Sequence, residues 1–97
     1  MYLQRLRLDG RRALVTGGAS GIGKAIAATF LWKGATVLIL DKNDPPMKEL
    51  QLLGSVYHFP VDIGFRGEVR EGLKGRSAFD VLVNNAGIEI PHSFEKS

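Results

Sequence analysis

The sequence predicts an α/β fold, a truncated doubly wound parallel sheet of about four strands with helices on its faces. Two observations carry this prediction. Four short apolar runs alternate with segments that have helical spacing, so strands and helices follow one another along the chain. A glycine-rich turn, Thr16-Gly17-Gly18-Ala19-Ser20-Gly21-Ile22-Gly23, joins the first apolar run to the first helix. At 97 residues the chain has the length of one small domain, so we expect residues 1–97 to form a single unit.

The first strand and the first helix flank this turn. The apolar run Ala13-Leu14-Val15 predicts a strand over about residues 12–15. The helix after the turn is expected to end near Lys33, with Gly34 as its left-handed cap. Its buried side is expected to hold four apolar residues: Ile22, Ile26, Ala27 and Phe30.

A second strand and a short helix are expected next. The continuous apolar run over residues 36–40 is typical of a strand that is covered on both faces. Asp44 is expected to cap a short helix with Pro45 and Pro46 in its first turn, and Gly54 is expected to end it. The apolar side of this helix is expected to comprise Met47, Leu50 and Leu53.

The third strand is expected over residues 56–59 and the fourth over residues 81–83, which read Val81-Leu82-Val83. Between them, residues 64–77 keep helical spacing through three apolar residues: Phe65, Val69 and Leu73. Glycines at three positions lower the helix propensity of the same segment: Gly67, Gly72 and Gly75. The sequence therefore predicts a third helix over this segment, weakened by its glycines.

The composition excludes several classes of function. The chain has no cysteine, so disulfides, thiolate nucleophiles and cysteine-based metal sites are excluded. No apolar run approaches membrane-spanning length and the N-terminus lacks the apolar core of a signal peptide, so we expect a cytoplasmic location and no membrane partner. The net charge of +3 is modest. The arginines near the N-terminus are interrupted by Asp9 and lack interleaved aromatic residues, which predicts a solvated basic face and no nucleic-acid partner.

The glycine-rich turn is a candidate phosphate site. A strand end, a glycine turn and a helix start bring several backbone N–H groups and the positive end of a helix dipole into one small volume. Gly17 suits a left-handed backbone, while Gly21 and Gly23 leave room for a ligand and for close packing of the helix. A plain tight turn is one alternative. A P-loop is another, since Gly18 to Lys24 fits Gly-x-x-x-x-Gly-Lys, but Ala25 stands where a hydroxyl would bind magnesium.

Polar residues follow the other three predicted strands: Asp41, Asp62 and Asn85. Because ligands bind at the carboxyl ends of the strands in doubly wound sheets, we expect these residues and the turn to form one site. Asp41 stands 18 residues after Gly23, near the spacing at which an acidic residue meets the adenosine ribose of a dinucleotide. Its carboxylate would accept from both ribose hydroxyls and repel a 2′-phosphate. This favours NAD over NADP, although the adjacent Lys42 softens the preference. A strand-end turn residue is the alternative interpretation of Asp41.

Together these motifs resemble the N-terminal half of a short-chain dehydrogenase/reductase. The motifs are Thr16-Gly17-x-x-x-Gly21-x-Gly23, Asp41, Asp62-Ile63 and Asn84-Asn85-Ala86-Gly87. The resemblance implies a Rossmann-like sheet in the order 3-2-1-4 and NAD as the cofactor. It implies that Ser20 and Ile22 meet the pyrophosphate at the glycine turn, and that Asp41 meets the adenosine ribose. It further implies that the adenine and the ribose side of the pocket are lined by Asp62, Ile63, Asn85, Ala86 and Gly87.

The chain departs from this family in length and in its catalytic residues. Family members are much longer, and their catalytic Ser and Tyr-x-x-x-Lys pair have no counterpart here. Four residues after Tyr2 stands Leu6, and four after Tyr57 stands Val61. We therefore expect a partial NAD-binding domain without the catalytic half and assign no catalytic residue.

Two functions remain open at this point. One is the NAD(H)-binding portion of an oxidoreductase that transfers hydride between a nicotinamide cofactor and an alcohol or ketone. The alternative is a non-catalytic dinucleotide-binding or interaction module. In either case the apolar strand expected over residues 81–83 forms a sheet edge, which predicts self-association or pairing with a complementary C-terminal half.

Overall fold

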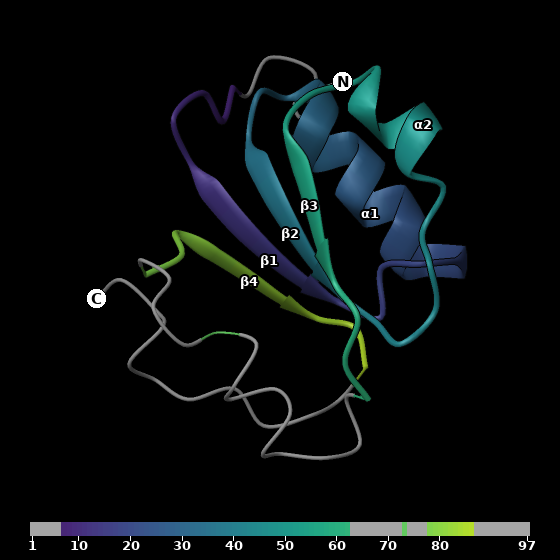
Figure 1. Ribbon diagram of the computed structural model, residues 1–97. Coiled ribbons are helices and arrows are strands. Elements are labelled where there is room, and N and C mark those ends of the chain that lie inside the picture. The colour runs from purple at the N-terminus through teal and green to yellow at the C-terminus, as the bar shows by residue number, and fades with distance from the viewer. Residues whose placement is uncertain (1–6, 63–72, 74–77, 87–97) are drawn as a thin grey trace.

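The computed structural model of the chain describes residues 7–62, 73 and 78–86 (Figure 1). In this part of the chain the elements are, in order, β1 (Arg12–Thr16), α1 (Gly21–Trp32), β2 (Thr36–Leu40), α2 (Met47–Gln51), β3 (Val56–Phe59) and β4 (Val81–Asn84). The four strands form one parallel sheet in the order β3-β2-β1-β4. The predicted fold class and strand order are therefore confirmed.

The two central strands, β1 and β2, are buried on both faces of the sheet. On the face that carries α1 and α2 (Figure 1), alternate strand residues pack against the helices in one cluster: Ala13, Val15, Ala27, Leu31, Val37, Ile39 and Leu50. The opposite face carries a second cluster: Leu14, Leu38, Leu40, Val61, Leu73 and Phe79. Successive side chains of a strand point to opposite faces, so burial of both faces requires unbroken apolar runs. This is the physical reason for the continuous run at residues 36–40.

α1 packs on the sheet through a stripe that shares Ala27 with the predicted one but is otherwise different. Its buried residues are spaced four apart: Gly23, Ala27 and Leu31. Ile22 is 73% exposed, so its predicted burial is wrong, and Ile26 and Phe30 are half-buried. The small residues at positions 23 and 27 let the helix approach the sheet closely, which turns Ile22 outward.

The end of α1 is as predicted. The helix ends at Trp32, and Gly34 has φ of +98°, in the left-handed region that favours glycine. The Gly34 N–H donates to the carbonyl oxygen of Leu31 at 2.9 Å. The chain can therefore reverse directly into β2.

The predicted cap of α2 is wrong. Pro46 occupies the N-cap position, no side chain caps the helix, and Asp44 lies two residues further out. Two consecutive prolines delay the helix start to Met47, because each fixes its own φ and restricts the residue before it. The Asp44 carboxylate instead lies 3.9 Å from Nδ1 of His58. On the expected apolar side, Leu50 is buried but Leu53 lies beyond the helix and is partly exposed.

β1 and β4 each extend one residue further than predicted, since Thr16 pairs with Asn84. The third helix predicted over residues 64–77 lies outside the described residues except for Leu73, which is fully buried. None of the described helices is long and apolar enough to cross a membrane.

Candidate functional site

The glycine-rich turn lies at the carboxyl end of β1, the central strand next to β4. Gly17 has φ of +71° and Gly21 has φ of +62°, so both adopt the left-handed backbone that glycine tolerates. The Gly17 N–H donates to the carbonyl oxygen of Leu40 at 2.8 Å, which ties the turn to the end of β2. A Cβ at Gly23 would overlap the carbonyl oxygen of Gly17. The turn therefore keeps this shape only with glycine at position 23.

The start of α1 is open to an anion. Ser20 is the N-cap residue and is exposed, with an extended backbone and a hydroxyl that makes no capping hydrogen bond. The first helical turn carries no acidic side chain, and Gly21 and Ile22 are exposed. The first backbone N–H groups of a helix lack intrahelical acceptors and carry the positive end of its dipole. This end of α1 therefore has the charge and the donors that a phosphate requires.

Asp41 follows β2 and is held against the glycine-rich turn. Its Oδ2 accepts a hydrogen bond from the backbone N–H of Ala19 at 3.1 Å. Its Oδ1 accepts from the backbone N–H of Asn43 at 2.9 Å. A carboxylate has about four acceptor positions, so these two bonds fix its orientation and leave capacity on each oxygen for a further donor. The structure thus places a carboxylate that can accept further hydrogen bonds beside the start of α1.

Thr16 joins the turn to the end of β4. Its side chain is buried and its hydroxyl donates to Oδ1 of Asn84 at 3.2 Å, while accepting from the backbone N–H of Ala86 at 3.2 Å. Asn85 in turn donates from Nδ2 to the carbonyl oxygen of Gly17 at 3.2 Å. The segment after β4 is therefore fastened to the same turn that follows β1.

The structure brings together most of the predicted site residues at the carboxyl ends of the strands. The turn, Asp41 and the Asn85–Ala86 segment are connected by the hydrogen bonds above. Asp62 is half-buried and follows β3 on the far side of β2. Two predicted residues, Ile63 and Gly87, lie outside the described residues.

Two residues at the carboxyl ends of the strands were not predicted as site residues from the sequence. Thr16 is the first residue of the glycine-rich turn, and its position at the end of a strand is the sequence feature that could have indicated it. His58 of β3 gave no signal: its Nε2 lies 2.8 Å from the main-chain oxygen of Asp41, a contact between residues 17 apart in the sequence.

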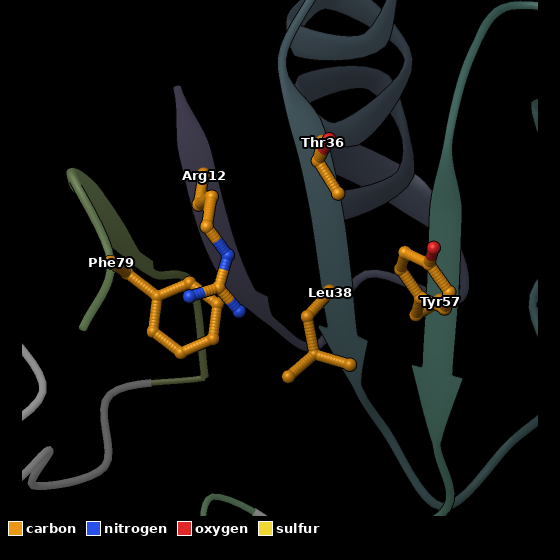
Figure 2. A pocket seen from close by; sticks show the side chains of 5 residues that line it. All are labelled: Arg12, Thr36, Leu38, Tyr57 and Phe79. Atoms are coloured by element: carbon orange, nitrogen blue, oxygen red, sulfur yellow. The ribbon is translucent and has the colours of Figure 1, made fainter. Parts of the chain in front are cut away.

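A hollow of about 270 Å³ lies at the other end of the sheet. Figure 2 shows its lining side chains, Arg12, Thr36, Leu38, Tyr57 and Phe79. Arg12 and Thr36 are the first residues of β1 and β2, so the hollow is near the amino ends of the strands. The Arg12 guanidinium lies 4.8 Å from the centre of the Phe79 ring and donates to the carbonyl oxygen of Ala78 at 3.3 Å. These contacts give Arg12 a structural role, and none of the predicted site residues lines this hollow.

Comparison with known proteins identifies the family of this chain and relatives of similar sequence. Residues 11–97 match the family model described as short chain dehydrogenase. Zerumbone synthase of Zingiber zerumbet is 41% identical over 91 residues, which cover 86% of this chain and 34% of that protein.

Solved structures give the same result. The chain resembles an NADP active-site complex of RhlG from Pseudomonas aeruginosa with a TM-score of 0.72 and 33% identity, over 82% of this chain and 36% of that one. It resembles 3-oxoacyl-[acyl-carrier protein] reductase of Brucella melitensis in complex with NAD with a TM-score of 0.66 and 37% identity, over 79% and 33%. The chain spans about a third of the length of these relatives. By its sequence, its sheet and its glycine-rich turn, the chain belongs to the short-chain dehydrogenase family.

Proposed function

We propose that this chain is the NAD(H)-binding portion of an oxidoreductase that transfers hydride between a nicotinamide cofactor and an alcohol or ketone. One observation carries the proposal: the Asp41 carboxylate is fixed by the Ala19 N–H against the turn that opens α1. A carboxylate that can accept hydrogen bonds from hydroxyls thereby lies beside backbone N–H groups that can donate to a phosphate. The ribose and the pyrophosphate of one dinucleotide require this arrangement. Membership of the short-chain dehydrogenase family supports the hydride-transfer chemistry.

In this proposal each group of residues at the carboxyl ends of the strands binds one part of the cofactor. The pyrophosphate lies at the start of α1, where Ser20 and Ile22 meet it and three glycines give it room: Gly17, Gly21 and Gly23. Asp41 accepts from the hydroxyls of the adenosine ribose. The adenine and the ribose side of the pocket are lined by Asp62, Ile63, Asn85, Ala86 and Gly87.

The preference for NAD over NADP rests on Asp41. A 2′-phosphate placed at this carboxylate would meet its negative charge, whereas two hydroxyls would meet positions that accept hydrogen bonds. Lys42 is exposed next to it and supplies a positive charge that weakens the discrimination. The similar structures include one complex with NADP and one with NAD, so the family alone supports either cofactor.

The residues of this chain bind and orient the cofactor, and the bound nicotinamide supplies the hydride chemistry. The described residues include one tyrosine, Tyr57, which lines the hollow at the opposite end of the sheet and has Val61 four residues later. It is therefore badly placed to move a proton at the nicotinamide. The proposal gives this chain no proton-transfer residue.

Removal of the Asp41 carboxylate tests the site. Asp41→Ala is expected to weaken NADH binding about 10- to 100-fold, because hydrogen bonds to a charged group are lost. NADPH binding is expected to weaken less or to strengthen, since the repulsion is lost too. Cofactor fluorescence and thermal stability during titration measure both affinities. Asp44→Ala is the matched control, because it removes an equal charge three residues further along the chain. The Asp44 side chain is 95% exposed. Unchanged affinities for both cofactors in Asp41→Ala would show that the site is misplaced.

A non-catalytic interaction module is the second candidate, favoured by one observation. Among the described strands β4 pairs only with β1, and it is half-buried and apolar over Val81–Val83. A folded chain that gives no saturable response to NADH or NADPH would favour this candidate over the first.

A further inference from the structure

His58 is a nearly buried polar side chain at the end of the sheet where the candidate site lies. It stands in β3 opposite Ile39 of β2, and its side chain is 11% exposed. The last pair between these strands is Leu40 with Phe59, so Asp41 lies one residue beyond the ladder. Nε2 of His58 reaches across to the main-chain oxygen of Asp41 at 2.8 Å. The imidazole thus extends the connection between β3 and β2 by one residue.

The chemistry of this contact fixes the role of the ring. A carbonyl oxygen only accepts hydrogen bonds, so Nε2 must carry a proton and donate. Nδ1 lies 3.9 Å from Oδ1 of Asp44, beyond hydrogen-bond distance, and the Asp44 side chain is 95% exposed. An exposed pair at this separation contributes little. The bond to the Asp41 carbonyl is therefore the principal polar contact of His58.

Asp41 is consequently held at three points. His58 binds its main-chain oxygen, Ala19 donates to Oδ2 and Asn43 donates to Oδ1. The first contact sets where the backbone leaves β2, and the other two set the plane of the carboxylate. A group held in its binding orientation by its surroundings loses less freedom when the ligand arrives.

We propose that His58 is a positioning residue that orients Asp41 for the adenosine ribose and so contributes to the preference for NAD over NADP. This inference rests on the proposed function, because it assigns Asp41 to the ribose. Position 58 needs only an apolar side chain for packing, since it stands on the face of the sheet that α1 and α2 cover. Packing alone does not require a polar side chain here. The side chain of His58 is nonetheless nearly buried and donates to the carbonyl oxygen of Asp41, which indicates a further role.

The test is a double-mutant cycle on the 97-residue chain. His58→Leu is expected to weaken NADH binding about three- to tenfold, the range for loss of one neutral hydrogen bond. NADPH binding is expected to change less, so the ratio of the two affinities falls. In the Asp41→Ala background His58→Leu is expected to have no further effect on NADH, because the group that it positions is gone.

Two amide variants keep the inference testable if His58→Leu fails to fold. Glutamine places an N–H near the position of Nε2, whereas asparagine places one near Nδ1. His58→Gln is therefore expected to retain most of the NADH affinity and His58→Asn to lose it, with Asp44→Asn as an unaffected control.

The possible failures are distinguishable. If Asp41→Ala weakens NADH binding but His58→Leu changes both cofactors equally, or acts as strongly without Asp41, His58 is only structural and the inference is wrong. Equal NADH affinity in His58→Gln and His58→Asn would also overturn it. If Asp41→Ala has no effect on either cofactor, the proposed ribose site itself fails, and the inference with it.

Discussion

Gly23 lies in the first turn of α1, packed against the backbone of Gly17, and this packing leaves no space for a side chain. A Cβ there would overlap the Gly17 carbonyl and come within 2.8 Å of Nδ2 of Asn85. Replacing glycine by alanine inside a helix ordinarily stabilises it by about 0.5–1 kcal/mol. At this position we expect the opposite: Gly23→Ala should lower the free energy of unfolding by about 1–3 kcal/mol, as overpacking does. Urea unfolding followed by circular dichroism measures the change.

A second glycine provides the control for this prediction. A Cβ at Gly54 would meet its nearest atom, the Leu31 carbonyl oxygen, at 3.4 Å, which is ordinary contact. Gly54→Ala should therefore leave the urea midpoint close to that of the unchanged chain. Equal midpoints for the two variants would mean that the turn and the helix are not packed as the structure has them.

Individual residues were predictable where one position decided the outcome, and not where a distant contact did. Gly17 and Gly34 were expected in left-handed conformations and adopt them, because local backbone geometry alone selects glycine there. Ile22 was expected to be buried because it is apolar, yet the small residues beside it decide which side of α1 meets the sheet. The bond from His58 to Asp41 depends on strand register, which periodicity does not reveal.

At the scale of elements, Thr16 connects the ends of β1 and β4. Its hydroxyl bonds both Asn84 and the backbone N–H of Ala86 while its side chain is 1% exposed. Thr16→Val keeps the shape of the side chain but removes both of these hydrogen bonds, so we expect about 1–3 kcal/mol of lost stability. Thr16→Ser keeps the hydroxyl and should lose much less. The difference between the urea midpoints of the two variants measures the contribution of the hydroxyl to stability. Equal midpoints would contradict the proposed connection between the ends of β1 and β4.

The elements themselves were largely readable from the sequence, for a reason specific to this sheet. β1 and β2 are covered on both faces, so each is a continuous apolar run that no exposed helix resembles. The short helix α2 was found, but its start was misplaced, since Asp44 was expected to cap it and the prolines shift the start to Met47. The link from β1 to β4 joins residues 68 apart, as in Thr16 and Asn84, and no local signal predicts such a pair.

At the scale of the whole molecule, the described sheet has two unlike edges. β3 at one edge carries an exposed Tyr57 and the nearly buried side chain of His58, and α2 packs against it. β4 at the other edge reads Val-Leu-Val-Asn and is half-buried over its apolar residues. Among the described residues no charged side chain interrupts β4. An apolar, uncharged edge strand is a surface that favours pairing with another chain.

We therefore expect the 97-residue chain to self-associate through β4 or to pair with a complementary C-terminal half. Light scattering should show an apparent mass that rises with protein concentration. A charge blocks an edge strand because it cannot be buried unpaired against a partner, so Leu82→Lys should reduce the association. The matched control is Ile26→Gln on the half-buried apolar side of α1, away from the sheet edge, which should leave it intact. A constant monomer mass at high concentration would rule out self-association, and loss of association in Ile26→Gln alone would move the contact from the sheet edge to α1.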